Sequence, residues 1–290
     1  MLLDPETLAL APGVERLLGP EGLKTELFSC LVETNTPVCE TVFQARGELR
    51  RLRRLVAERA AREGLVVAAS GSHPFSTPEQ QRIVDEPRYR EMVEELGPIA
   101  KAQLVCGLHV HVGMESFDAC LRTLAGIRPW LSSVLELSAN SPYFAGEEMG
   151  SLSSRLARLR RLPRSGPPPN LSTVAEWEST VAAAGVDYTQ IWWDARPHPR
   201  LGTLEVRIAD QPTSVERAAA IVALVQALCA APPEPGPHVL DAVELPAREL
   251  GTWELVETLR EPAEAFRQLD VGRREGLAAV AADVVSRSHA

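Results

Sequence analysis

The sequence predicts an α+β fold, and two observations support this prediction. Helix-like and strand-like segments are interspersed along the 290 residues without the regular rhythm of parallel βαβ units. Two short segments, 107–113 and 202–207, alternate polar and apolar residues with period two, as half-buried strands do. A chain of this length can also bury a substantial core.

The N-terminal half is expected to alternate between short strands and helices. Turn-forming residues and a short helix occupy 4–20, and the apolar runs 26–33 and 65–69 predict strands. A helical pattern covers 42–63 and stops at Gly64, a typical residue just beyond a helix end. A helix over 87–97 and a strand over 102–113 follow.

The C-terminal half is expected to be mainly helical. Two helices lie within 115–141 and are separated near Gly126 and Pro129, and Ser172 is placed as the N-cap of a helix that reaches Ala184. The other predicted elements are a helix over 147–161, a Pro/Gly-rich loop over 163–169, a strand over 202–209, an apolar helix over 214–230, a proline-rich linker over 231–237 and a helical region over 252–288.

The polar residues of the two alternating segments carry most of the chemical information. Strand alternation places His109 and His111 on one face, and it places Thr203, Glu205 and Arg207 on one face of the second strand. Each pattern alone is also compatible with hydrogen-bonded histidines or a solvated ion pair. Together, two imidazoles, a carboxylate and a guanidinium suit a metal-bound polyphosphate better than a plain core.

The surrounding sequence adds a family resemblance. The run Ile-Trp-Trp-Asp-Ala-Arg-Pro-His-Pro-Arg at 191–200 leads directly into the Glu-x-Arg strand, and Val-Glu-Thr-Asn-Thr occupies 32–36. Over roughly residues 1–230, these motifs resemble bacterial carboxylate–amine ligases of the glutamate–cysteine ligase type 2 family, relatives of glutamine synthetase. The resemblance implies a glutamine synthetase-like catalytic fold, in which helices pack on the outer face of a curved antiparallel sheet. We expect one domain over 1–290, with a divergent helical region over 238–290.

The same resemblance implies an ATP- and Mg²⁺-dependent ligase. The carboxylate of an amino acid, glutamate by default, is expected to be joined to cysteine or another amine through an acyl phosphate. The implied metal ligands are Glu33, His109, Glu205 and Glu26; the implied catalytic residues are Arg207, Glu205, His111 and Arg155; and the implied ATP contacts are Arg207, His111, Arg200 and His198. Asp194 and Arg196 are expected to brace the loop before the strand.

Two features fit poorly with the site that the resemblance implies. Glu26 and Glu33 are an odd number of residues apart, so a straight strand would point them to opposite faces. In addition, family members usually begin with a Gly-Val-Glu-x-Glu strand that binds metal, whereas this chain begins Met-Leu-Leu-Asp-Pro. This leaves open an upstream start, a shortened enzyme with altered metal use, or a catalytically weak or inactive member that binds nucleotide or a partner. Besides a ligase and a binding protein, a metal-dependent hydrolase is a third functional class, but it would give Arg207 no role.

Composition excludes several classes of protein. A net charge of −9 argues against nucleic-acid binding, and no apolar run approaches the ~20 residues of a membrane span. The N-terminal residues lack a secretory signal pattern, so a cytoplasmic protein is expected. The five scattered cysteines predict reduced thiols, and no P-loop or Rossmann motif is present. The expected partners are small-molecule substrates and, by resemblance, a second copy in a homodimer.

Overall fold

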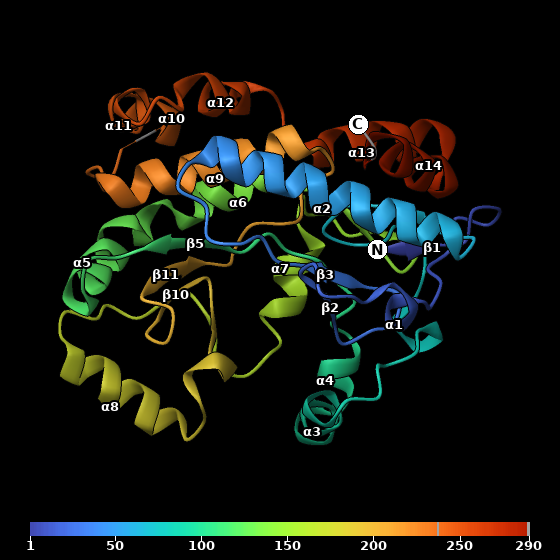
Figure 1. Ribbon diagram of the computed structural model, residues 1–290, viewed down its shortest axis with the longest axis horizontal. Helices are drawn as coiled ribbons and strands as arrows, with labels where there is room; N and C mark the ends of the chain where they lie inside the picture. Colours follow the sequence, from blue (N-terminus) through green and yellow to red (C-terminus); the bar gives the residue numbers. More distant parts are fainter. Residues whose placement is uncertain (237, 289–290) are drawn as a thin grey trace.

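The helices and strands of this chain form an α+β fold, which confirms the predicted class (Figure 1). The computed structural model describes residues 1–236 and 238–288. The helices are α1 (Val14–Leu17), α2 (Val42–Arg62), α3 (Pro87–Leu96), α4 (Pro98–Lys101), α5 (Phe117–Ile127), α6 (Leu131–Ser138), α7 (Ser154–Leu159), α8 (Val174–Ala184), α9 (Val215–Ala230), α10 (Val239–Ala242), α11 (Glu244–Glu249), α12 (Trp253–Glu257), α13 (Glu264–Glu275) and α14 (Leu277–Ser288). The strands are β1 (Leu2–Leu3), β2 (Leu23–Thr25), β3 (Val32–Thr34), β4 (Val66–Val67), β5 (Val110–Gly113), β6 (Tyr143–Phe144), β7 (Glu147–Glu148), β8 (Ser165–Gly166), β9 (Trp192–Trp193), β10 (Ala195–His198) and β11 (Thr203–Val206).

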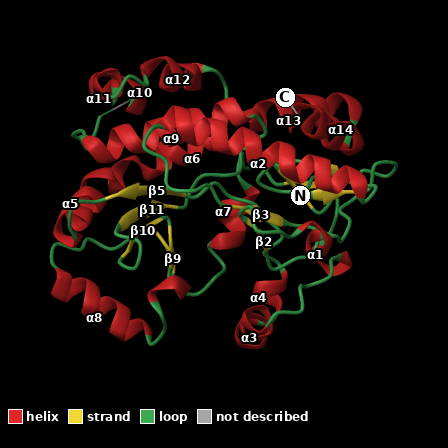
Figure 2. Cartoon of the chain, viewed as in Figure 1, coloured by secondary structure: helices red, strands yellow, loops and turns green. Residues whose placement is uncertain are grey.

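The central sheet is antiparallel and has the order β10-β11-β5. Isolated bridges extend it, because Gly107 pairs with Asp210 and Val105 pairs with Ser72. Ser72 lies shortly after β4, which pairs in turn with β1. Figure 2 shows β5, β10 and β11 on one side of α7 and β2 and β3 on the other, all beneath α2 and α9. The strand predicted over 102–113 is therefore regular only in its last four residues.

The apolar face of this sheet packs against α9. Leu204 and Val206 on β11 and Val110 on β5 are buried in the same cluster as Ile221 and Leu224 of α9. Strand alternation sends their neighbours to the opposite face, where the polar residues lie. The helices thus cover one face of the sheet and leave the other to the site.

Two predicted elements are wrong in detail. The run 26–33 is not one strand, because the chain reverses between β2 and β3, which pair with each other antiparallel. The helix predicted over 147–161 starts only after Ser153, whose side chain accepts a hydrogen bond from the Leu156 amide. Residues 147–148 instead form β7, which pairs with β6 through a turn in which Ala145 and Gly146 have positive φ.

The cap of α8 lies one residue beyond the predicted position. Thr173, rather than Ser172, is the N-cap, and its side chain accepts from the Glu176 amide while the Glu176 carboxylate accepts from the Thr173 amide. This reciprocal arrangement is a capping box. Elsewhere, α2 and α9 agree with their predicted ranges to within one residue at each end.

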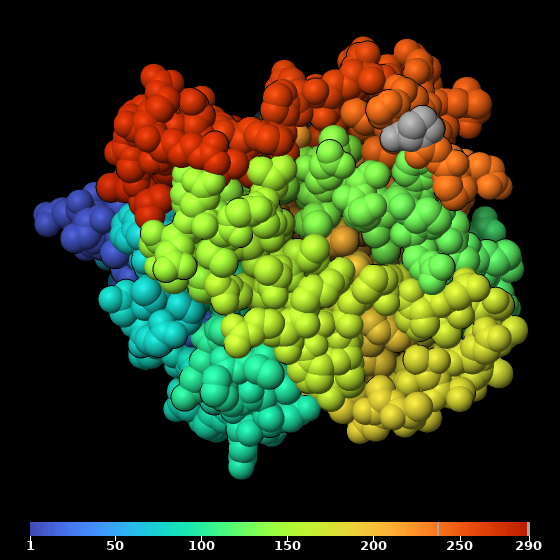
Figure 3. Space-filling model, turned by 180° about the vertical axis from the view of Figure 1, so that it is seen from behind, coloured from blue at the N-terminus to red at the C-terminus, as the bar shows by residue number. Residues whose placement is uncertain are grey.

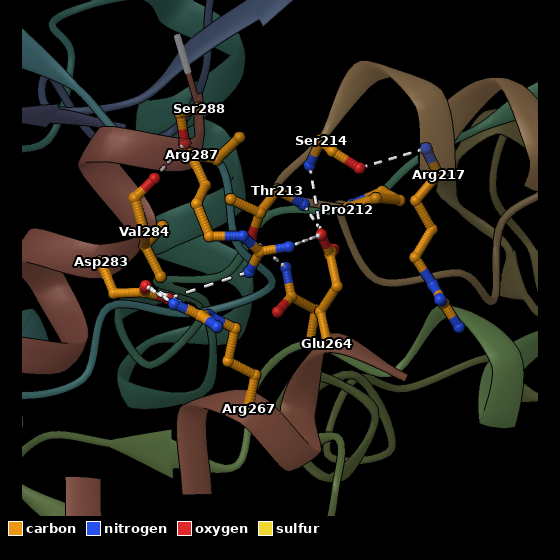
Figure 4. Close-up of polar contacts among 12 residues, drawn as sticks. Pro212, Thr213, Ser214, Arg217, Glu264, Arg267, Asp283, Val284, Arg287 and Ser288 are labelled. Carbon is orange, nitrogen blue, oxygen red and sulfur yellow. Dashed lines mark hydrogen bonds and ion pairs between the residues drawn. The ribbon is translucent and has the colours of Figure 1, made fainter. Parts of the chain in front are cut away.

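The C-terminal helices are held on the remainder of the fold by a buried carboxylate. Figure 4 shows Glu264 at the start of α9, where it accepts hydrogen bonds from the amides of Thr213 (2.6 Å) and Ser214 (3.2 Å). Arg287 of α14 donates to the same carboxylate at 3.0 Å. A negative charge at a helix N-terminus is favourable because the first amides have no partners within the helix. Seen from behind, the orange and red C-terminal residues lie along one end of the molecule (Figure 3).

Within the described ranges, no helix is both long and apolar enough to cross a lipid bilayer.

We expect Glu264→Ala to lower the free energy of unfolding by about 3 kcal/mol, because it leaves Arg287, the buried Thr213 amide and the partly buried Ser214 amide without this acceptor. Urea denaturation measures the change. Glu261→Ala is the matched control, since Glu261 is exposed and only its main-chain carbonyl accepts a hydrogen bond. Equal losses in the two variants would contradict the proposed clamp.

Candidate functional site

The site is centred on β5 and β11, which bring the predicted polar residues together. Glu205 lies opposite His111 in the antiparallel register, and His109 lies two residues before His111. The His109 Nδ1 and the His111 Nε2 are each 3.7 Å from the Glu205 Oε1. The Arg207 guanidinium approaches His109 Nδ1 at 3.5 Å. These four side chains therefore lie together, as strand alternation predicted.

Glu205 is a buried carboxylate held between two guanidinium groups. Arg196 donates from Nε to Oε2 at 2.8 Å, and Arg207 donates from Nη1 to Oε1. Burial alone would raise the pKa of Glu205, but the charge of Arg207, followed by the neighbouring His109 and the charge of Arg196, holds this pKa at about 2. Glu205 is therefore ionised at neutral pH.

The two histidines are neutral at pH 7. Surrounding protein, followed by the charge of Arg207, lowers the pKa of His109 well below its usual value, although 40% of the side chain remains exposed. Burial likewise lowers the pKa of His111, against the opposing effect of Glu205. Neutral imidazoles can accept a proton or a hydrogen bond or ligate a metal.

His198 lies beside His111, whereas Arg200 lies further out. The rings of His111 and His198 meet edge to face at 5.5 Å between centroids, and the Tyr188 hydroxyl lies 3.3 Å from His198 Nδ1. His111 Nδ1 forms a hydrogen bond of 2.9 Å with Thr203 Oγ1. Arg200 is exposed and pairs with Asp187 at 2.6 Å.

The loop before β11 is braced by buried ion pairs, as expected for Asp194 and Arg196. Arg160 donates to both carboxylate oxygens of Asp194 at 2.7 Å. Arg196 donates to the main-chain carbonyls of Tyr188, Thr189 and Ile191 as well as to Glu205. Arg196 thus ties the site carboxylate to the preceding loop.

The resemblance implied that Arg155 is a catalytic residue. In the structure its side chain is buried and does not reach the exposed polar face of β5 and β11. Only 3% of Arg155 is exposed, and its guanidinium donates to the carbonyls of Arg207 and Ile208 at 3.0 Å. Its guanidinium packs on Gly107, where an added Cβ would lie 2.1 Å from Nη2. Arg155 therefore donates to main-chain carbonyls just beyond the end of β11.

Glu26 and Glu33 form a second polar group on β2 and β3. Lys24 pairs with Glu33 across the hairpin, so Glu26, two residues beyond Lys24, faces Glu33. The hairpin removes the difficulty posed by their odd spacing. Burial, followed by the adjacent carboxylate of Glu33, raises the pKa of Glu26 to about 7.

The four predicted metal ligands thus fall into two pairs. Residues 1–236 and 238–288 contain no group of three or more His, Cys, Asp or Glu side chains arranged to hold a metal ion. The Glu26–Glu33 pair fits a hard divalent cation, because two crowded carboxylates supply oxygen ligands and a negative charge to neutralise. Glu205 fits less well, since guanidinium groups already occupy both of its oxygens.

Sequence reasoning missed the direct bond of Arg196 to Glu205. The signal for it was present: the turn Pro-Arg-Leu-Gly at 199–202 closes a hairpin in which Gly202 has φ 64°, and this register sets Arg196 opposite Glu205. Asp210 was also missed, because its partners Ser141, Ser153 and Asn140 are distant in sequence.

Comparison with solved structures relates this fold to that of a ligase. A crystal structure of a bifunctional glutathione synthetase from Pasteurella multocida superposes with a TM-score of 0.61, at 14% identity, over 96% of this chain and 50% of that one. This agreement shows that the two chains share a fold, as the predicted α+β class requires.

The family description "Glutamate-cysteine ligase family 2 (GCS2)" matches residues 4–288, so the chain belongs to that family. The match extends well past the limit near residue 230 that the sequence motifs indicated. A Herpetosiphon aurantiacus protein named "Putative glutamate--cysteine ligase 2" is 38% identical over 78% of this chain and 62% of its own length. A Rubrobacter xylanophilus protein named "Putative glutamate--cysteine ligase 2-3" is 39% identical over 80% and 68%. The chain therefore spans about two thirds of the relatives it matches.

We expect Glu26→Gln to stabilise the protein at alkaline pH. The pKa of Glu26 is about 7 when folded and close to 4.5 when unfolded, so the unfolded state binds fewer protons between these values and wild-type stability falls as pH rises through the window. The shift corresponds to at most about 3 kcal/mol above pH 7, which the amide removes. Urea unfolding at pH 5 and pH 8 measures it, with the exposed Glu40→Gln as control. A variant whose advantage is equal at both pH values would refute the assignment.

Proposed function

We propose that the protein is an ATP- and Mg²⁺-dependent ligase that joins the carboxylate of an amino acid to an amine. Glutamate is the proposed acid, and cysteine or another amino compound is the proposed amine. Membership of the glutamate–cysteine ligase family 2 and the ligase fold support this class of reaction. The observation that carries the proposal within the chain is the cluster of Glu205, Arg207, His109 and His111 on two adjacent strands.

The proposed reaction has two steps. A carboxylate oxygen of the acid attacks the γ-phosphorus of ATP, which gives an acyl phosphate and releases ADP. The amine nitrogen then attacks the acyl carbon, phosphate leaves, and the amine loses a proton. No covalent bond to the enzyme is required, so the protein contributes positioning and charge stabilisation.

Arg207 is proposed to contact the transferring phosphoryl group. Its guanidinium is permanently charged, is anchored on one side by Glu205 and is 16% exposed, so part of it reaches the open face. Neutral His111 is available to accept the amine proton. His198 and Arg200 are proposed to contact the nucleotide from the β10 side.

Mg²⁺ is proposed to bind at Glu26 and Glu33, where it would neutralise negative charge on the phosphates. The raised pKa of Glu26 supports this placement, because two crowded, half-buried carboxylates without a counter-cation retain a proton between them. Glu205 and His109 remain proposed ligands, and a metal there must compete with Arg207 for the carboxylate oxygen Oε1.

Calorimetric titration with a non-hydrolysable ATP analogue tests the proposal directly. We expect binding with Mg²⁺ present and binding weakened by tenfold or more without it, since the cation screens the phosphates from the carboxylates. Glu26→Gln should weaken the Mg²⁺ dependence, whereas the exposed Glu40→Gln should leave it unchanged. A folded chain that binds no nucleotide under either condition would rule out the ligase assignment.

We expect Arg207→Ala to reduce acid- and amine-dependent ADP release by about 10²- to 10³-fold, the usual effect of removing one charge-stabilising donor. The fold should persist, because Arg196 still pairs with Glu205. Glu205→Ala is a poorer probe, since it would leave the buried Arg196 without its counter-charge. The exposed Arg161→Ala is the control. Undiminished turnover in Arg207→Ala would remove Arg207 from the site.

A further inference from the structure

The strand that carries the site changes register just beyond Arg207. Val206 lies opposite Val110, whereas the next bridge sets Asp210 opposite Gly107. Between these pairs, one strand advances three residues and the other advances four. The segment 207–209 therefore holds one extra residue, which is a β-bulge. A bulge re-aims the neighbouring side chains and disturbs the ladder hydrogen bonds.

Arg155 supplies donors at this bulge. Its Nη2 donates to the carbonyl of Arg207 and its Nη1 donates to the carbonyl of Ile208, each at 3.0 Å. The two acceptors are the carbonyl oxygens of successive residues. A planar guanidinium can donate to both at once from fixed positions, whereas an ammonium cannot. Gly107 permits the approach, because any side chain there would overlap the guanidinium.

A second set of contacts fixes Arg155 itself. Asp210, at the far end of the bulge, lies 3.9 Å from Arg155 Nη1 and accepts hydrogen bonds from Ser141 (2.6 Å) and Ser153 (2.8 Å). The Ser141 hydroxyl also accepts from the Arg155 amide at 3.2 Å, and Ser153 caps the helix on which Arg155 lies. Both ends of the bulge are therefore tied to the start of α7.

We propose that Arg155 is a positioning residue that holds the bulge and so directs the Arg207 guanidinium toward Glu205, His109 and the reacting phosphoryl group. The phosphoryl part rests on the proposed function, whereas the direction of Arg207 does not. Arg155 acts through the main chain of Arg207 and needs no contact with substrate.

The first test follows Arg207 without measuring activity. In ¹⁵N-labelled protein, the side-chain Nε–H signal of Arg207 is assigned by its loss in Arg207→Lys. We expect this signal to shift or broaden in Arg155→Met and to move less in Arg155→Lys, which keeps one donor. Arg217→Met is the matched control, because Arg217 also braces main-chain carbonyls, those of Leu137 and Glu261, but elsewhere in the fold. An Arg207 signal unmoved in Arg155→Met, or in Arg155→Lys if the Met variant does not fold, would overturn the proposal.

The second test separates positioning from general loss of structure. If the wild type is active, Arg155→Met should lower kcat by about 10²-fold with KM for ATP within about twofold, because Arg207 acts on the transition state. In an Arg207→Ala background the same change should cost less than about twofold in kcat, since the residue through which Arg155 acts is gone. An equal loss in both backgrounds would refute the coupling. An inactive wild type would count against the ligase function alone, and the spectroscopic test would still decide the positioning role.

Discussion

The buried carboxylate of Glu205, held between Arg196 and Arg207, is the interaction on which the site depends. A carboxylate with so little exposure stays ionised only because two cations lie within hydrogen-bonding distance. Burial, aided by the charge of Arg207, lowers the pKa values of His109 and His111 and keeps both imidazoles neutral. This salt-bridge cluster therefore keeps the Glu205 carboxylate ionised on the polar face of β5 and β11.

Local patterning predicted the parts of this arrangement that depend on strand alternation alone. His109, His111, Glu205 and Arg207 meet because residues two apart share a face and β5 pairs with β11 in register. The failures were chain reversals inside apolar sequence. The run 26–33 contains no Gly, Pro, Asn or Asp, so nothing marked the reversal that separates β2 from β3. The hairpin changes the relation of Glu26 to Glu33 from opposite faces to the same face.

Long-range contacts account for what the sequence did not predict. The role of Arg155 depends on Gly107, Asp210 and two carbonyls more than fifty residues away, and no spacing rule connects them. The bulge is equally invisible, because one extra residue in a strand changes neither composition nor the length of an apolar run. Strand alternation and the family motifs indicated the polar residues, whereas the tertiary structure shows the contacts that each one makes.

The clamp at Glu264 has a consequence for the order in which the newly made chain acquires its structure. The amides of Thr213 and Ser214, just before α9, donate to a carboxylate that lies about fifty residues later, and the arginine that pairs with this carboxylate lies later still, on α14. During synthesis the start of α9, which is connected to β11 by residues 207–214, therefore lacks this acceptor until α13 has been made. The start of α9 therefore acquires its final contacts only after α13 and α14 have been made, later than β5 and β11.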